Sequence, residues 1–128
     1  MRYLLPIFVL CLFAGCGENV SVSGKVTYTD GTPVTVGQVA FDDDKFFGRA
    51  DLQPDGSYRM GRIKDGDGIP KGTYKVFLYD ANIYEEPPGG GSSIVKPQVS
   101  AKYMSADTSE LTCTVDGKTV FNFTVEKP

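Results

Sequence analysis

The most strand-like run in this sequence is Gly72-Thr73-Tyr74-Lys75-Val76-Phe77-Leu78-Tyr79. Aromatic and β-branched residues, which are enriched in strands, dominate it, and a glycine opens it. The apolar side chains at 74, 76 and 78 share one face, because successive side chains of a strand point to opposite sides. Phe77 and Tyr79 fall on the other face. The run therefore predicts a central strand that is covered on both faces.

Period-two alternation recurs on both sides of this run, and no amphipathic helical stretch of useful length accompanies it. The alternating positions are Val20, Val22, Val26 and Tyr28, then Val39 and Phe41, Ala50 and Leu52, Tyr58 and Met60, Leu111, Cys113 and Val115, and finally Phe121, Phe123 and Val125. Gly/Pro/Asp turns separate these segments. Their number and spacing predict an all-β fold, a seven-stranded antiparallel β-sandwich.

Two glycine turns are predicted to close β-hairpins. With a three-residue loop that ends in a left-handed Gly117, Leu111 lies opposite Phe121 and the apolar faces of both strands agree. A two-residue loop would turn Phe121 away from the core. The Pro-Asp-Gly turn likewise places Leu52 opposite Tyr58. We therefore expect a type I turn with a glycine bulge at both places.

Residues 81–109 differ in composition from the rest of the chain. Their centre reads Glu85-Glu86-Pro87-Pro88-Gly89-Gly90-Gly91-Ser92-Ser93. Such a composition does not support a strand ladder, so we expect a long loop that is flexible at its centre. Connections of this length are usually functional or disordered. The segment from Val99 to Tyr103 either adds an edge strand or lies across the sheet.

The amino-terminal residues have the layout of a secretory signal, with Arg2 before an apolar run that ends at Phe13. This run has about half of the roughly 20 apolar residues that a membrane-spanning helix needs. Ala14-Gly15-Cys16 follows and resembles a bacterial lipobox, although Phe13 stands where leucine is most frequent. We expect residues 1–15 to be removed and Cys16 to carry a diacylglyceryl and palmitate anchor. The alternative is ordinary signal cleavage without lipid.

The expected mature protein is one domain, residues 20–126, joined to its anchor by residues 16–19. Its net charge is about −4, because Arg2 is lost from a chain whose formal charge is −3. The acidic residues are spread along the chain and no basic stripe is present. A nucleic-acid partner is therefore not expected, whereas a membrane is expected through the lipid at Cys16.

Cysteine and histidine contents speak against catalysis. The chain has 3 cysteines and 0 histidines. Cys11 leaves with the signal and Cys16 carries lipid, so Cys113 has no disulfide partner and is expected to be a small buried hydrophobe. Without histidine, Ser-His-Asp triads, His-ligated zinc and imidazole acid-base chemistry are excluded. We expect no enzymatic activity and no cofactor.

Two acidic segments are weak candidates for a calcium site. They supply the hard oxygen ligands that calcium prefers, from Asp42, Asp43, Asp44, Asp65 and Asp67. Neither segment matches an EF-hand loop. Aspartate is also a common turn former, and we favour that interpretation.

Aromatic residues outside the main core phase are candidate ligand contacts, because aromatic faces stack on sugars and on partner proteins. They are Phe46, Phe47 and Tyr84. For Tyr79 we favour a covering role on the second face of its strand, and for Phe46 and Phe47 both interpretations stay open.

Four motifs carry a family resemblance. They are Ser23-Gly24-Lys25-Val26-Thr27-Tyr28, Asp30-Gly31-Thr32-Pro33-Val34, Pro54-Asp55-Gly56-Ser57-Tyr58 and Gly72-Thr73-Tyr74-Lys75-Val76. In this order they resemble the carboxypeptidase regulatory-like domain, a seven-stranded transthyretin-like (prealbumin-like) sandwich that also occurs alone in short bacterial lipoproteins. Gln53 departs from the acidic residue that often opens the Asp-Gly turn. The resemblance implies a fold more than a function.

These observations predict an exported, membrane-anchored lipoprotein of the cell envelope, on the periplasmic or outer face. We expect a non-enzymatic binding or structural module with an envelope protein or polysaccharide as partner. The alternative is a carbohydrate-binding module that uses exposed aromatic residues. An enzyme is the third and least favoured possibility.

Overall fold

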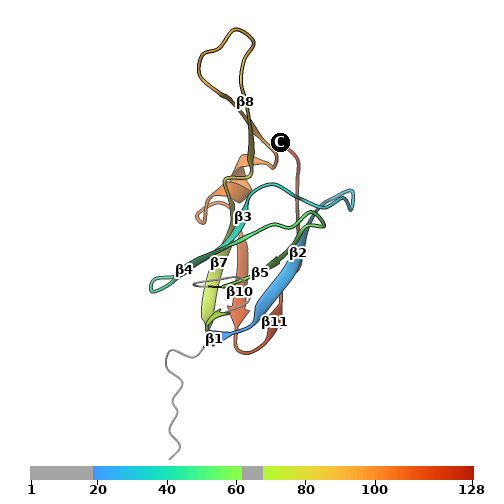
Figure 1. Ribbon diagram of the computed structural model, residues 1–128. Coiled ribbons are helices and arrows are strands. Elements are labelled where there is room, and N and C mark those ends of the chain that lie inside the picture. Colours follow the sequence, from blue (N-terminus) through green and yellow to red (C-terminus); the bar gives the residue numbers. More distant parts are fainter. Residues whose placement is uncertain (1–18, 62–67) are drawn as a thin grey trace, which may run out of the picture.

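Two β-sheets face each other across one hydrophobic core in the computed structural model, which describes residues 19–61 and 68–128 (Figure 1). The larger sheet is antiparallel and has the order β10-β7-β3-β4. Its strands are β3 (Gln38–Asp42), β4 (Phe47–Asp51), β7 (Gly72–Tyr79) and β10 (Leu111–Val115). The predicted central strand is β7, which lies between β10 and β3 and confirms the prediction.

The smaller sheet is built around β2 (Val22–Tyr28). Along one edge of β2, β5 (Ser57–Arg59) pairs antiparallel. Along the other edge, β11 (Thr119–Val120) and β12 (Phe123–Val125) pair parallel to β2. Because β11 and β12 keep the same register against β2, they form one interrupted strand.

Counting the interrupted strand once, the two sheets hold four and three strands, which makes seven. The all-β sandwich with seven strand positions is therefore confirmed. The strands pair mainly antiparallel, as predicted, except that the interrupted strand runs parallel to β2. Two short strands, β1 (Asn19–Val20) and β6 (Ile69–Pro70), pair with each other.

Inward-facing residues of both sheets fill the core. On β7 these are Tyr74, Val76 and Leu78, none of them more than 1% exposed. The Phe41 ring of β3 lies 5.7 Å from the ring of Tyr74 and 6.4 Å from the ring of Tyr58 in the opposite sheet. Tilted aromatic contacts of this kind add to the burial of apolar area, so they help to join the two sheets.

The predicted hairpin between residues 111–115 and 121–125 is wrong. Leu111 lies opposite a residue of β7, whereas β11 and β12 belong to the other sheet. The predicted faces are confirmed, because Phe123 is buried and Val120 is 63% exposed. Whether a loop has an odd or an even number of residues decides which side chains of the next strand face the core. This holds for a hairpin and equally for a connection that crosses from one sheet to the other.

The predicted glycine turn before β5 is confirmed, although the strands that flank it separate. Gly56 has a φ of 84° and donates its N–H to Gln53 O at 2.8 Å, while Gln53 N–H donates to Ser57 O at 2.8 Å. These bonds form the turn and its glycine bulge. The strand before the turn, β4, belongs to the larger sheet, whereas the strand after it, β5, pairs with β2. The predicted hairpin therefore does not continue away from the turn. Gly117 also has a positive φ, as predicted, but its value of 150° lies outside the left-handed helical region.

Residues 81–109 contain a β-hairpin, so the prediction that this region lacks a ladder is wrong. β8 (Asn82–Glu85) pairs antiparallel with β9 (Ile94–Pro97), and the hairpin projects from the end of the sandwich away from β1 (Figure 1). The Pro/Gly-rich residues are confined to its connection. A 3-10 turn, η1 (Ala101–Met104), follows. Val99 and Tyr103 are buried, so their segment packs against the sandwich and adds no edge strand.

The parallel pairing beside β2 contains one irregularity. Phe121 N–H donates to Ser23 O at 2.8 Å, as in a regular parallel ladder. The next bond of such a ladder would join Lys25 N–H to Phe121 O. Here Lys25 N–H donates instead to the side-chain oxygen Asn122 Oδ1 at 2.9 Å. The Asn122 amide therefore replaces a backbone acceptor and leaves the Phe121 carbonyl for another donor.

That donor is the Tyr58 hydroxyl, which donates to Phe121 O at 2.5 Å. Tyr58 is 1% exposed, and burial raises the pKa of its phenol above the usual range, so the hydroxyl stays protonated. Gly24 lies between the two partners. A β-carbon at position 24 would overlap Phe121 O and lie 2.8 Å from the Tyr58 oxygen. Glycine is the residue that leaves room for this bond.

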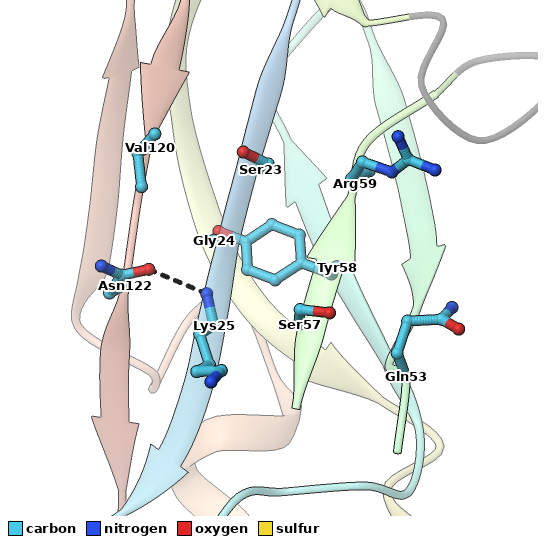
Figure 2. A pocket seen from close by; sticks show the side chains of 9 residues that line it. All are labelled: Ser23, Gly24, Lys25, Gln53, Ser57, Tyr58, Arg59, Val120 and Asn122. Carbon is cyan, nitrogen blue, oxygen red and sulfur yellow. Dashed lines mark hydrogen bonds between the residues drawn. The ribbon is translucent and has the colours of Figure 1, made fainter. Parts of the chain in front are cut away.

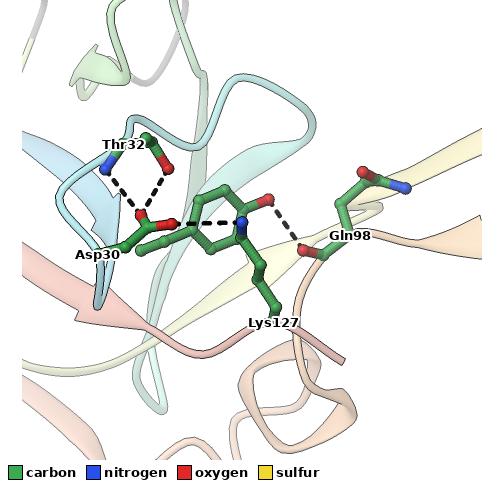
Figure 3. A network of polar contacts seen from close by, with 5 residues as sticks. Asp30, Thr32, Gln98 and Lys127 are labelled. Carbon is green, nitrogen blue, oxygen red and sulfur yellow. Dashed lines mark hydrogen bonds and ion pairs between the residues drawn. The ribbon is translucent and has the colours of Figure 1, made fainter.

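A second polar network ties the end of β2 to the carboxy-terminal segment (Figure 3). Asp30 Oδ1 accepts hydrogen bonds from Thr32 N at 3.0 Å and Thr32 Oγ1 at 2.7 Å, and Asp30 Oδ2 lies 3.3 Å from Lys127 Nζ. Tyr28 donates its hydroxyl to Gln98 O at 2.9 Å. The Thr32 N–H, more than the other donors, lowers the pKa of Asp30 to about 2.

Replacement of Gly24 by alanine should reduce the free energy of unfolding by about 1–3 kcal/mol, because the added methyl group has no room. Tyr58→Phe should cost about 1–3 kcal/mol, because it leaves the partly buried Phe121 carbonyl without a donor. Ser23→Ala, at the neighbouring outward position, serves as the matched control and should change little. Urea denaturation measures all three; a Gly24→Ala protein as stable as the wild type would contradict this account.

Stability in acid should depend on Asp30. Since its pKa in the folded protein, about 2, lies below the ordinary value of 3.8, the ionised carboxyl stabilises the fold above pH 3.8. This contribution is lost as the pH falls through about 2. Asp30→Asn should flatten the acid side of the stability profile between these pH values. Asp116→Asn, in an exposed turn, is the control and should keep the wild-type slope in denaturation curves recorded from pH 5 to pH 2.

Candidate functional site

Several predicted sites lie outside the described residues, namely the signal segment 1–15, the lipidation site Cys16, and Asp65 and Asp67. Of the other acidic candidates, Asp43 accepts the N–H groups of Lys45 at 2.8 Å and Phe46 at 2.7 Å, which is the behaviour of a turn former. Within residues 19–61 and 68–128, no three acidic or cysteine side chains are grouped so that they could hold a metal ion. Asp42 and Asp44 thus join no such group there.

The predicted aromatic contacts occupy three different places. Phe46 is half-buried and packs edge-on to the Tyr74 ring at 6.0 Å, so it belongs to the rim of the core. Phe47 is 46% exposed on the outer face of the larger sheet. Tyr84 is 54% exposed on the projecting hairpin and donates its hydroxyl to Asp80 Oδ1 at 2.5 Å. The structure does not bring these three rings together.

Phe47 instead forms a cluster with residues of β4 and β7, which we call the aromatic face. The Arg49 guanidinium lies 4.4 Å from the centre of the Tyr79 ring and 5.8 Å from that of Phe47. Phe77 lies beneath them and is only 9% exposed, so both faces of β7 are covered as predicted. Tyr79 is nevertheless 43% exposed, and part of its ring remains accessible.

The smaller sheet carries a shallow groove of about 580 Å³ on its outer face (Figure 2). We call it the β2 groove and define it by its outward-facing residues. These are Ser23 and Lys25 of β2, Ser57 and Arg59 of β5, and Val120 and Asn122 of the interrupted strand. Gln53 stands at its rim, and Gly24 and Tyr58 contribute to its floor.

Strand register fixes the arrangement of this groove. Ser23 lies opposite Arg59 and Lys25 opposite Ser57, so Lys25 and Arg59 are diagonal neighbours on one face. Diagonal neighbours of this kind lie roughly 7–8 Å apart. Figure 2 shows Asn122 and Val120 on the other side of β2. The groove is therefore a grid of six side chains on three adjacent strands.

Two cations dominate the charge of the β2 groove. Lys25 and Arg59 line it, and none of its described lining residues is an aspartate or a glutamate. Asp55 lies nearby, but its Oδ1 accepts the hydroxyl of Ser57 at 2.6 Å and the N–H of Ser57 at 3.0 Å. These bonds lower the pKa of Asp55, and the nearby charge of Lys25 adds to the effect. The groove itself is positive on a chain whose formal charge is −3.

The Cys113 thiol does not line the β2 groove. Cys113 is buried with a free thiol, which confirms the predicted role as a small core residue. Burial also raises the pKa of this thiol, so it stays protonated near neutral pH.

In the part of the chain that the structure describes, no helix is long and apolar enough to cross a membrane.

Sequence reasoning missed the β2 groove. Alternation does place Ser23, Lys25 and Asn122 on the polar faces of their strands, and Ser57 and Arg59 likewise fall outside the apolar phase. A signal was therefore present in each strand. The pairing of β5 and of the interrupted strand with β2 brings these residues together, and no local pattern specifies that pairing.

Comparison with known proteins identifies the fold alone. No protein-family model matches the chain, and no curated protein matches it. The solved structures that are similar to this chain include two that are each described as a DUF3823 family protein. One, from Bacteroides ovatus, is 22% identical with a TM-score of 0.50 and is matched over 85% of this chain and 45% of its own. The other, from Parabacteroides merdae, is 16% identical with a TM-score of 0.52, over 86% of this chain and 47% of its own. This chain thus spans less than half the length of either.

Proposed function

We propose that this protein is a lipid-anchored, non-enzymatic binding module of the cell envelope. The observation that carries the proposal is the short distance in sequence between the lipobox cysteine, Cys16, and the first strand, which begins at Asn19. Acyl chains on Cys16 would therefore hold the sandwich directly at the membrane surface, with almost no linker. The β8–β9 hairpin would then point away from the membrane, because it projects at the end opposite β1 (Figure 1).

A binding role fits the chemistry of the β2 groove better than a catalytic role does. Its polar side chains are hydroxyls, amides and two cations, which hold ligands by hydrogen bonds and charge. Acid-base catalysis would need a group that changes protonation near neutral pH, usually a histidine, and the chain contains 0 histidines. These groups suit recognition without turnover.

The proposal also includes the type of β-sandwich that the domain forms. We infer that the domain is a transthyretin-like sandwich of the carboxypeptidase regulatory-like kind. The support is the order of the four motifs in the sequence and the division into sheets of four and three strand positions. The assignment places no ligand, since sandwiches of this architecture serve many functions.

A second candidate function is carbohydrate binding on the aromatic face. The specific observation in its favour is that Phe47 and Tyr79 are exposed on either side of Arg49, on the outer face of the larger sheet. Exposed aromatic rings can stack on the apolar faces of sugars. This site would favour neutral polysaccharide, and it is separate from the β2 groove.

Lipid attachment is tested by metabolic labelling with a palmitate analogue in a bacterial host. The wild-type protein should be labelled and recovered with membranes, whereas Cys16→Ser should lose both properties. Cys11→Ser is the matched control and should keep the label, because Cys11 lies in the segment that is expected to be removed. A labelled, membrane-bound Cys16→Ser protein would contradict the proposal.

Carbohydrate binding on the aromatic face is tested by affinity electrophoresis in gels that contain neutral polysaccharide. Phe47→Ala and Tyr79→Ala should each weaken retardation about tenfold, the effect of losing roughly 1.4 kcal/mol of stacking. Val95→Ala removes a residue that is similarly exposed, at 51%, but lies on the hairpin, and it should have no effect. Equal losses in all three variants would rule out a site on this face.

A further inference from the structure

The β2 groove offers two kinds of recognition side by side. Lys25 and Arg59 supply positive charge on neighbouring strands. Asn122 Oδ1 accepts a hydrogen bond from Lys25 N–H, so the amide nitrogen of Asn122 is left to donate outwards. Ser57 donates its hydroxyl to Asp55, so its oxygen is left to accept. Val120, at 63% exposure, adds an apolar wall. A matching ligand carries an anionic group, hydroxyl groups and an apolar C–H surface together.

The overall charge of the chain limits what this ligand can be. The formal charge is −3, and the cations among the described residues that line the groove are Lys25 and Arg59. A polymer with a negative charge on every unit, such as a nucleic acid, would meet repulsion wherever it left the groove. The lining residues that the structure describes also include no exposed aromatic side chain on which a base could stack. A single acidic unit, or a pair, within a largely neutral chain avoids this repulsion.

We propose that the β2 groove binds a carboxylated sugar unit, with Arg59 and Lys25 holding the carboxylate and the Asn122 and Ser57 side chains holding ring hydroxyls. The planar guanidinium of Arg59 matches a carboxylate by two parallel hydrogen bonds, and Lys25 adds a point charge. Val120 packs against the C–H face of the sugar ring. This inference rests on the proposed function and gives the binding module its ligand class, an acidic glycan.

The test is isothermal titration calorimetry on the purified full-length product in neutral detergent. The probes are digalacturonic acid and its neutral counterpart, the same disaccharide with both carboxyl groups reduced. We expect binding of the acidic probe, at least tenfold weaker binding of the neutral probe, and a further loss of affinity when salt is raised from 50 to 500 mM. Equal binding of both probes, or no binding of the acidic one, overturns the proposal.

Variants locate the site. Arg59→Gln and Lys25→Gln should each weaken binding of digalacturonic acid at least tenfold, and Arg59→Lys should weaken it by less, since it keeps the charge without the fork. Lys75→Gln, an exposed lysine on the outer face of the larger sheet, is the matched control and should bind like the wild type. All these side chains are exposed, so thermal melting of each variant should stay close to that of the wild type.

A control variant that loses as much affinity as Arg59→Gln would show general charge attraction and overturn the site. Inorganic phosphate that displaces digalacturonic acid at equal concentration would overturn the sugar class, because it would show an anion site without sugar recognition. Failure of lipid labelling is a separate outcome. A protein that lacks lipid but binds digalacturonic acid through Arg59 would contradict the proposed anchor and support the groove.

Discussion

The hydrogen bond from the Tyr58 hydroxyl to the Phe121 carbonyl, made across Gly24, is the constraint on which the smaller sheet depends. It turns one carbonyl of a parallel ladder into the core, and the Asn122 side chain then replaces that carbonyl as the acceptor for β2. The strand is interrupted at this point without a change of register. Because Asn122 is held against β2 in this way, the outer face of the sheet has a fixed polar edge beside Lys25. The floor of the β2 groove and the position of Asn122 at its edge thus follow from one interaction.

The β2 groove forms because β5 and the interrupted strand both pair with β2, one along each edge. β5 arrives at β2 directly after the glycine turn at 53–57, and the interrupted strand arrives from the opposite side after crossing from the larger sheet. Their outward residues therefore converge on β2 from both sides. If the lipid at Cys16 holds β1 at the membrane, the groove lies on the flank of the domain, where a glycan that runs along the surface can reach it.

Much of the fold could be predicted from the sequence, because alternation reports which side chains face the core. It placed Tyr74, Val76 and Leu78 inside, and it distinguished buried Phe123 from exposed Val120. Which strands pair could not be predicted as well. The odd number of residues in the loop after Leu111 agrees with a hairpin, but it agrees equally with a connection that crosses between the sheets. The β8–β9 ladder was missed because its short strands flank a Pro/Gly-rich connection that dominated the composition. The groove was missed because Lys25 and Arg59 are ordinary exposed residues until β5 pairs with β2.

The account is tested most directly by mapping ligand contacts with nuclear magnetic resonance on ¹⁵N-labelled protein. Addition of an acidic disaccharide should shift the backbone amide signals of residues 23–25, 57–59 and 120–122, and the side-chain amide of Asn122, while the signals of β4 and the β8–β9 hairpin stay in place. Such a pattern would join the floor set by Tyr58 and Gly24 to the ligand above it. Shifts confined to the aromatic face around Phe47 and Tyr79, or the absence of any saturable shift, would contradict the account.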